Sequence, residues 1–123
     1  MHSLVPHLLL RANGGSSQAS SLLRTAGYMV SKMDDDAIAE GMAGASHVDG
    51  VIVELPALAA IAFVRRLVAR YRDDVVVLVI TRAADAVRRA LPGTRVIRPA
   101  DVEDDLISTI DLALVAHQMQ GTG

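Results

Sequence analysis

Several polar residues follow short apolar runs, and their types allow only a narrow range of chemistry. The apolar runs cover residues 8–10, 51–53 and 75–80, and the pair Val96-Ile97 after Arg95. The residues placed directly after them are Arg11, Ala12, Asn13, Glu54, Thr81, Arg98 and Pro99. A lone carboxylate is a poor site for a hard divalent cation, which takes several oxygen ligands. Because an unpaired buried carboxylate is costly, we expect Arg11 and Arg98 to lie beside Glu54 as its ion-pair partners.

The pattern of the whole chain predicts the parallel sheet that would bring these residues together. Apolar runs alternate with stretches in which apolar residues recur at three- or four-residue intervals, the spacing of helices. The run 75–80 is apolar at every position, which is typical of a strand covered on both faces. The element order βαβαβαβαβα predicts an α/β fold of the flavodoxin-like (βα)5 type, a three-layer sandwich. Its five-stranded parallel sheet has the order 2-1-3-4-5, and functional groups gather at the carboxyl ends of the strands.

Three of the helices are expected to bury defined apolar stripes. The acidic run 34–36 favours a helix start, and the stripe of that helix is Ile38, Met42 and Ala45. The helix that begins at Ala57 repeats apolar residues at Leu58, Ile61, Val64, Leu67 and Val68. The last helix, capped by Asp101, carries a stripe of Leu106, Ile110, Ala113, Leu114 and His117.

Length and composition bound the class of protein. The 123 residues are enough for one domain, which we place at 1–118, with 119–123 as a tail or a cut linker. The chain has no cysteine, which excludes disulfides and thiolate chemistry. No apolar run approaches the length of a membrane-spanning helix, so we expect a cytoplasmic protein without membrane contact. The net charge of −2 gives no argument for nucleic-acid binding.

Taken in order, the residues at the strand ends resemble those of the receiver domains of bacterial two-component response regulators. Ala26-Gly27-Tyr28 is similar to the phrase that opens the second receiver strand, and residues 49–54 have the spacing of the third-strand motif. Glu54 then stands at the phosphoacceptor position, and Thr81 matches the switch hydroxyl. Arg98-Pro99 matches a Lys-Pro pair. The resemblance implies a phosphorelay signalling domain whose partner is a histidine kinase, a phosphotransfer protein or an output domain.

The departures from the receiver pattern concern the chemistry. Receivers carry an acidic pair after the first strand, where this chain has Arg11-Ala12-Asn13. Without those acids Mg²⁺ loses its ligands, and the extra methylene of Glu54 displaces the carboxylate from the attack geometry. We therefore expect a degenerate, non-phosphorylatable receiver that is not an enzyme, has no catalytic residue and needs no metal or cofactor. The resemblance also implies a cis peptide before Pro99, although most X-Pro bonds in folded proteins are trans.

Two interpretations of Glu54 stay open. A Glu54–Arg98 pair could imitate the contact that Lys makes to a phosphorylated Asp and hold the domain in one state. Alternatively, the pair only contributes modest stability. Glu54→Gln would change partner affinity in the first case and only stability in the second.

A partner surface is expected on the last two helices and the fifth strand. Residues 65–98 hold nine arginines and three acids, whereas residues 101–111 hold five acids and no Lys or Arg. The final helix is also too apolar for a one-sided element. We expect a homodimer through a self-complementary set of charged and apolar side chains: Arg88, Arg89, Arg95, Asp104, Asp105, Asp111, Leu112 and Val115.

Other functions remain as alternatives. The chain could accept a phosphoryl group at an unexpected residue, or it could be a small flavodoxin-like enzyme or ligand-binding domain. A ligand-binding domain should show a sizeable apolar cavity near Asn13, Glu54 and Thr81. The four histidines (His2, His7, His47 and His117) lack metal-ligand spacing, and no Gly-x-Ser-x-Gly nucleophile motif is present.

Overall fold

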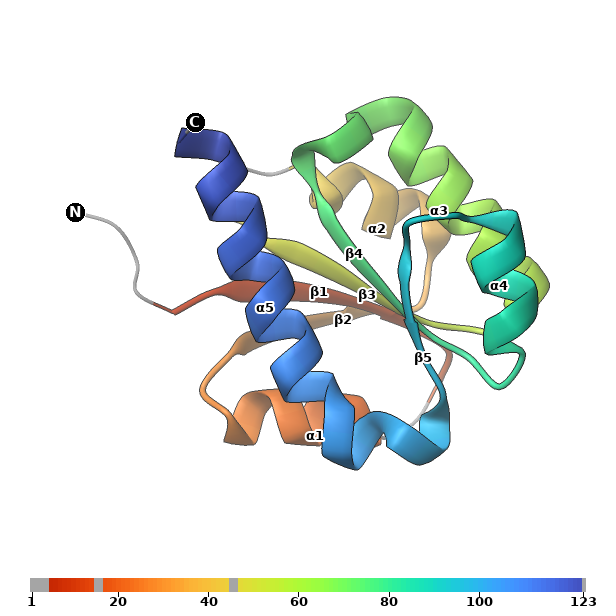
Figure 1. The fold of residues 1–123 in the computed structure, drawn as a ribbon, viewed down its shortest axis with the longest axis horizontal. Helices are drawn as coiled ribbons and strands as arrows, with labels where there is room; N and C mark the ends of the chain where they lie inside the picture. Colours follow the sequence, from red (N-terminus) through yellow and green to blue (C-terminus); the bar gives the residue numbers. More distant parts are fainter. Residues whose placement is uncertain (1–4, 15–16, 45–46, 123) are drawn as a thin grey trace.

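A five-stranded parallel sheet lies between two layers of helices in the computed structural model of the chain (Figure 1). The structure describes residues 5–14, 17–44 and 47–122. The strands are β1 (His7–Ala12), β2 (Met29–Met33), β3 (Gly50–Glu54), β4 (Val76–Ile80) and β5 (Arg95–Ile97). Their order in the sheet is β2-β1-β3-β4-β5, and every neighbouring pair is parallel. The predicted fold class and strand order are confirmed.

The helices cover the sheet unequally on its two faces. They are α1 (Gln18–Thr25), α2 (Asp36–Ala43), α3 (Ala57–Tyr71), α4 (Ala84–Ala90) and α5 (Val102–Thr122), with short 3₁₀ turns at Arg72–Asp74 and Pro99–Asp101. One core cluster joins α1 and α5 to one face of the sheet, and the other joins α2, α3 and α4 to the opposite face. Because α5 runs to Thr122, the boundary predicted at residue 118 falls inside this helix.

The alternation of side chains along β1 decides which face each residue serves. Leu8, Leu10 and Ala12 belong to the core cluster under α1 and α5, whereas Leu9 belongs to the cluster under α2, α3 and α4. Successive side chains of a strand point to opposite faces. Arg11 therefore lies on the face opposite to its neighbour Ala12, a separation that determines the make-up of the site.

The helix starts follow the local capping rules. Ser17 is the N-cap of α1, and its hydroxyl accepts a hydrogen bond from the Ser20 amide at 3.3 Å. Asp35 caps α2 by accepting from the Ile38 amide at 2.9 Å. Such caps satisfy amides that have no partner within the first turn. The expectation that residues 34–36 start a helix is confirmed.

Two of the predicted apolar stripes are partly wrong. Ile38 is 55% exposed and Leu58 is 84% exposed, although both were expected to face the core. The buried residues of α2 are instead Ala39 and Ala43, and α3 buries Ala60 beside its larger residues. Alanine allows a close approach of helix to sheet, yet it is also common on exposed helix faces and so gives little signal in a sequence. Ala45 lies outside the described residues.

The stripe of α5 agrees better with the prediction. Leu106, Ile110, Ala113 and Leu114 are buried, and His117 is half-buried.

Among the described residues, no helix combines the length and the apolar character needed to cross a bilayer.

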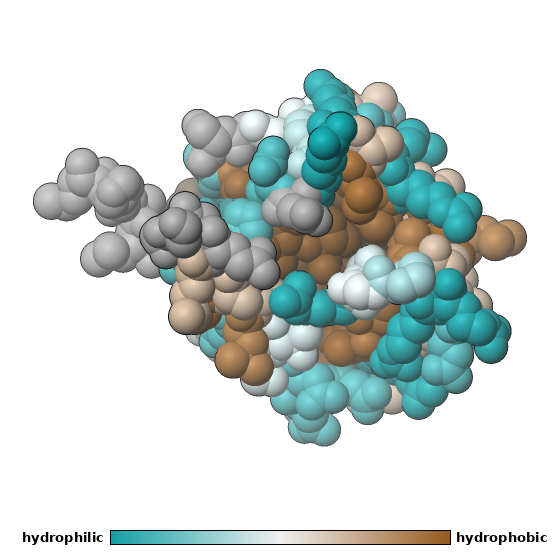
Figure 2. All heavy atoms as spheres, turned by 45° about the horizontal axis from the view of Figure 1, so that its top comes forward, coloured by the Kyte–Doolittle hydropathy of each residue, from teal (hydrophilic) through white to brown (hydrophobic). Residues whose placement is uncertain are grey.

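The end of the sheet where the strands begin carries an open hollow. Figure 2 looks onto this end and shows an apolar floor ringed by hydrophilic side chains. A cavity of about 430 Å³ lies here, with Val64, Val75 and Val77 in its wall and Arg72 and Arg95 among its polar residues. This cavity and the predicted site residues lie at opposite ends of the sheet.

Candidate functional site

A cavity of about 520 Å³ opens at the carboxyl ends of the strands. Five of the predicted site residues line it: Ala12, Asn13, Glu54, Thr81 and Pro99. They come from the ends of β1, β3 and β4 and from the turn after β5. The strand ends therefore bring these five residues together around one cavity, as expected from the sequence.

Glu54 ends β3 and stands in register with Ala12 of β1. Its side chain is half-buried, and Oε1 accepts a hydrogen bond from the Ser17 hydroxyl at 2.7 Å. Ser17 is already held at the start of α1 by its capping role. The cap therefore fixes the glutamate as well as the helix.

Ser17 is a site residue that the sequence did not assign. The sequence marks it as part of a loop and cap segment after the first strand. Because that loop starts at the carboxyl end of β1, next to β3, its cap lies close to the end of β3. The topology, together with the capping signal, could have identified it.

Arg11 does not pair with Glu54, so the expected contact is wrong. Its Nε donates to Asp36 Oδ1 at 2.6 Å, and its Nη1 donates to the Ala12 carbonyl and to Asn13 Oδ1, both at 3.2 Å. Arg11 is 7% exposed and lies on the face covered by α2 and α3. Strand alternation directs it away from the face on which Glu54 lies.

Arg98 does not pair with Glu54 either. Its Nη2 lies 3.7 Å from Asp85 Oδ2, and Asp85 also binds Arg88 Nη1 at 3.0 Å. Asp85 is in the first turn of α4, which brings it close to the turn after β5. The predicted Glu54–Arg98 pair is therefore wrong. The structure has no cis peptide among the described residues, so the cis bond implied before Pro99 is also wrong.

Thr81 is 4% exposed and follows β4 directly. Its backbone amide donates to the Ile97 carbonyl at 3.1 Å, which joins the end of β4 to β5. The Thr81 hydroxyl makes no hydrogen bond to any described residue. Since Thr81 lines the cavity, this hydroxyl is a candidate binding group.

The other lining residues come from the last position of β4 and from the first turns after β3 and β4. They are Leu55, Pro56, Ala57, Ile80, Arg82 and Ala83. Except for the guanidinium of Arg82, these side chains are apolar. The walls are therefore largely hydrophobic, and Glu54 supplies the carboxylate.

The donor set does not fit Mg²⁺, the ion that the receiver resemblance implies. Glu54 is the acidic residue that lines the cavity, and the Asn13 oxygen already accepts from Arg11. Within the described ranges, no three His, Cys, Asp or Glu residues gather closely enough to hold a metal ion. A hard cation needs several oxygen ligands, so these residues do not make its site.

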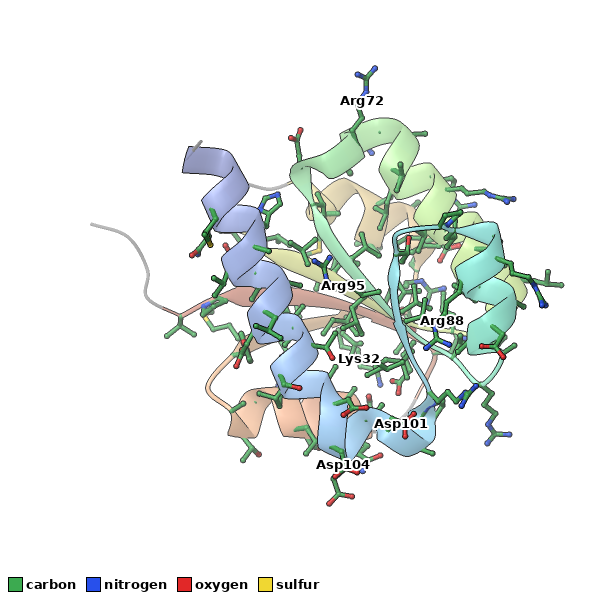
Figure 3. The ribbon with its side chains drawn as sticks, in the orientation of Figure 1. Lys32, Arg72, Arg88, Arg95, Asp101 and Asp104 are labelled. Atoms are coloured by element: carbon green, nitrogen blue, oxygen red, sulfur yellow. The ribbon has the colours of Figure 1, made fainter. Side chains whose placement is uncertain are left out.

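The predicted partner surface is exposed throughout. Arg88, Arg89, Arg95, Asp104, Asp105, Asp111, Leu112 and Val115 are all on the surface of α4, β5 and α5. Figure 3 shows Asp104 at the lower end of α5, with Arg88 and Arg95 above it. Leu112 is 72% exposed and Val115 is 53% exposed, so α5 presents apolar side chains on its outer face.

Arg88 also protects the edge of the sheet. Its Nη2 donates to the Val96 carbonyl at 3.0 Å, and Val96 is in the edge strand β5. Arg88 thereby occupies one backbone acceptor of the edge strand, and covering an edge opposes uncontrolled pairing with other strands.

Comparisons with known proteins support the fold. No protein-family model and no curated protein sequence matches the chain. A response regulator receiver protein from Sinorhizobium medicae WSM419 superposes with a TM-score of 0.73 at 19% identity, covering 93% of this chain and 98% of that chain. The signal receiver domain of an HD domain-containing protein from Pseudomonas fluorescens Pf-5 superposes with a TM-score of 0.75 at 16% identity, covering 99% of this chain and 96% of that one.

A de novo designed Rossmann 2x3 protein also superposes, with a TM-score of 0.61 at 14% identity and coverage of 88% of this chain and 90% of the designed one. The resemblance to receiver domains is confirmed at the level of the fold. Because a designed protein shares that fold, the function has to be argued from the site.

Proposed function

We propose that this chain is a receiver-like signalling domain that acts through protein contacts and does not accept a phosphoryl group. The observation that carries the proposal is the register of Ala12 beside Glu54, at the strand end where receivers hold acids. Phosphoryl transfer depends on positioning and on a metal ion that neutralises the developing charge. One glutamate in an apolar cavity supplies neither.

The contacts of Glu54 also bear on how the domain works. Glu54 is held by the neutral hydroxyl of Ser17, and Arg98 is engaged with Asp85. The interpretation in which a Glu54–Arg98 pair holds the domain in one state therefore has no support from the contacts. We propose that the domain's surface, and not a switch at Glu54, carries the signal.

The test is incubation of the protein with acetyl phosphate and Mg²⁺, followed by intact mass. A response regulator with the full set of acids serves as the positive control. We expect the control to gain the mass of a phosphoryl group and this chain to stay unchanged. Modification at any residue would contradict the proposal and support the alternative of an unexpected phosphoacceptor.

We further propose that the α4-β5-α5 surface forms a homodimer. Basic side chains of α4 and β5 lie beside acids of α5, a distribution that suits a two-fold contact in which each patch meets its opposite. Leu112 would supply apolar contact in the middle of the charged set. Histidine kinases, phosphotransfer proteins and output domains are the partner classes that could use the same surface in the cytoplasm.

Sedimentation at high micromolar concentration tests the dimer. We expect a dimer for the natural sequence and a monomer for Leu112→Asp. Leu58→Asp is the matched control, because Leu58 is 84% exposed on α3, away from the proposed surface. A monomer for the natural sequence, or equal effects of the two substitutions, would overturn the proposed interface.

A further inference from the structure

The cavity at the carboxyl ends of the strands has the size and the walls of a small-molecule site. Its volume of about 520 Å³ lies within the range of roughly 300–1,000 Å³ found for ligand pockets. Apolar walls come from Leu55, Pro56, Ile80, Ala83 and Pro99. Such pockets combine a hydrophobic lining with a few polar groups that orient the ligand.

Glu54 is the first of these polar groups, and its charge is not neutralised by a described side chain. Oε1 accepts from the Ser17 hydroxyl, and Oε2 makes no hydrogen bond to a described residue. Both arginines that were expected beside Glu54 form ion pairs with other residues, Arg11 with Asp36 and Arg98 with Asp85. A carboxylate in mainly apolar surroundings favours a cation or a strong hydrogen-bond donor as its partner.

Thr81 is the second polar group, and it points to a ligand independently of Glu54. It is more than nine-tenths buried, lines the cavity and has a hydroxyl without a hydrogen-bond partner among the described residues. Buried polar side-chain atoms are nearly always hydrogen-bonded to protein or to ordered water, so a ligand in the cavity can take the place of water at this hydroxyl. The Thr81 hydroxyl oxygen can therefore accept a hydrogen bond from a ligand in the cavity.

We propose that this cavity binds a small organic cation, a primary amine on a short apolar body. The ammonium group binds the Glu54 carboxylate and donates to the Thr81 hydroxyl, while the apolar body contacts Leu55, Ile80 and Pro99. An anionic ligand is disfavoured because its charge would meet Glu54. Arg82 also lines the cavity, but it is exposed, and water screens its repulsion of a cation.

The binding site is separate from the proposed signalling surface, which lies on α4, β5 and α5. Failure of the amine to bind would leave the phosphorylation and dimer tests unaffected. Success would make the cavity an input site that responds to a soluble ligand in place of a phosphoryl group.

The experiment is a titration of the isotope-labelled protein with benzylamine, followed through the backbone amide chemical shifts. Benzyl alcohol and benzoate are the comparison probes, because they keep the ring and replace the ammonium group by a neutral hydroxyl or by an anionic carboxylate. We expect saturable shifts around Asn13, Glu54, Thr81 and Arg82 for benzylamine. Its affinity should exceed that of the alcohol by about tenfold, the effect of one charge-assisted hydrogen bond, and benzoate should bind weakest.

Three variants complete the test. Glu54→Gln should lower benzylamine affinity by about tenfold, to the level of benzyl alcohol. Ala83→Phe should abolish binding by filling the cavity while leaving Glu54 in place. Asp111→Asn removes an exposed acid that does not line the cavity and should have no effect.

Three results would overturn the proposal. They are the absence of saturable shifts, equal affinity for the amine and the alcohol, and an unchanged affinity of Glu54→Gln. Dispersed amide spectra of the unliganded variants confirm that each is folded, so that a loss of binding is not mistaken for unfolding.

Discussion

Near the carboxyl ends of β1 and β3, charged residues form different contacts on the two faces of the sheet. On the face covered by α2 and α3, Arg11 binds Asp36 at 2.6 Å and Arg66 binds the same carboxylate at 2.7 Å. Glu40 lies 3.7 Å from Arg66 and 3.8 Å from Arg70. This chain of ion pairs joins β1, α2 and α3.

On the face covered by α1 and α5, the contacts of charged groups are sparse. Glu54 accepts one hydrogen bond, from Ser17, and makes no ion pair with a described residue. Its neighbour across the strand pair is Ala12, which brings no charge. Glu54 therefore borders a cavity and not an ion-pair network, and the cavity lies at the end of the sheet, since Leu55 and Ala57 of the opposite helix layer also line it.

The difference shows how the position of one residue along a strand decides what a site can do. Arg11 and Ala12 are adjacent in sequence but lie on opposite faces, so the arginine strengthens the helix layer and the alanine borders the cavity. A shift of the strand by one residue would exchange these roles. The chemistry of the cleft therefore depends on register as much as on residue type.

The largest expected effect comes from breaking the network at its buried end. Arg11→Met removes the hydrogen bonds to Asp36, Asn13 and the Ala12 carbonyl. The side-chain oxygen of Asn13 and the carbonyl of Ala12 then lack the guanidinium donor. We expect the free energy of unfolding to fall by about 2 kcal/mol, as for loss of one partner of a mostly buried pair. Urea unfolding measures it.

Arg82→Met is the control for this substitution. Arg82 is exposed, and the same change there should alter the free energy of unfolding by less than about 0.5 kcal/mol. Equal losses in the two variants would show that the network on the α2 and α3 face contributes no special stability.

A smaller effect is expected from Gly44, where α2 ends against α3. The Tyr71 hydroxyl donates to the Glu40 carbonyl at 2.6 Å, and a Cβ at Gly44 would overlap the Tyr71 ring. Gly44→Ala should therefore cost about 1–2 kcal/mol through overpacking. Thermal unfolding by circular dichroism measures the difference.

Gly41→Ala provides the matched control in the same helix. Apart from the helix's own backbone and the neighbouring residues, no described atom lies within 4 Å of a Cβ built there, so alanine should stabilise α2 by about 0.5–1 kcal/mol through its better helix propensity. A destabilised Gly41→Ala, or a Gly44→Ala as stable as the natural protein, would show that the contact with Tyr71 does not restrict this turn.

On the face of α1 and α5, the buried hydroxyl of Ser20 lowers the free energy of unfolding, and a substitution can remove this penalty. This hydroxyl is buried and has no hydrogen-bond partner among the described residues. Ser20→Ala should raise the free energy of unfolding by about 1 kcal/mol, since an apolar group replaces an unsatisfied one. Urea unfolding of Ser20→Ala and of Ser21→Ala, an exposed position in the same helix, compares them.

The gain in Ser21→Ala should stay at the few tenths of a kcal/mol that helix propensity gives. If Ser20→Ala destabilises the protein, the hydroxyl has a partner, such as a water molecule, that stabilises the native state.

The smallest expected effect on stability comes from Glu54. Glu54→Gln keeps an oxygen that can accept from Ser17 and removes a charge that forms no ion pair with a described residue. We expect a change of less than about 0.5 kcal/mol in urea unfolding. A loss as large as that of Arg11→Met would contradict the contrast between the two faces.

Much of the fold could be predicted because the apolar runs mark the strands directly. The short stretch Arg95-Val96-Ile97 predicts β5, and the fully apolar run at 75–80 predicts a strand buried on both faces. The alternation of strands and helices then predicts a parallel sheet, and five such units match the flavodoxin-like order 2-1-3-4-5. The same topology places Glu54 and Thr81 at one edge.

The partners of the charged residues could not be predicted in the same way. Arginine side chains are long, and Arg98 reaches Asp85 of α4 because the turn after β5 lies next to the start of α4. Arg11 binds Asp36 because its side chain points to the face of the sheet that α2 covers. The run at 8–10 is apolar at every position, so the sequence does not reveal which face each residue of this strand serves. The sequence places charges near a strand end, but side-chain direction decides which of them meet.

We infer that the one carboxylate which the described strand ends bring to this cavity, that of Glu54, is too few to hold a magnesium ion. The most direct measurement is a titration of the isotope-labelled protein with MgCl₂, with the amide chemical shifts of Ala12, Asn13, Glu54 and Thr81 as the readout. We predict only the small, non-saturating shifts of changing ionic strength. Saturable shifts confined to these residues, lost in Glu54→Gln, would show a magnesium site and contradict the account.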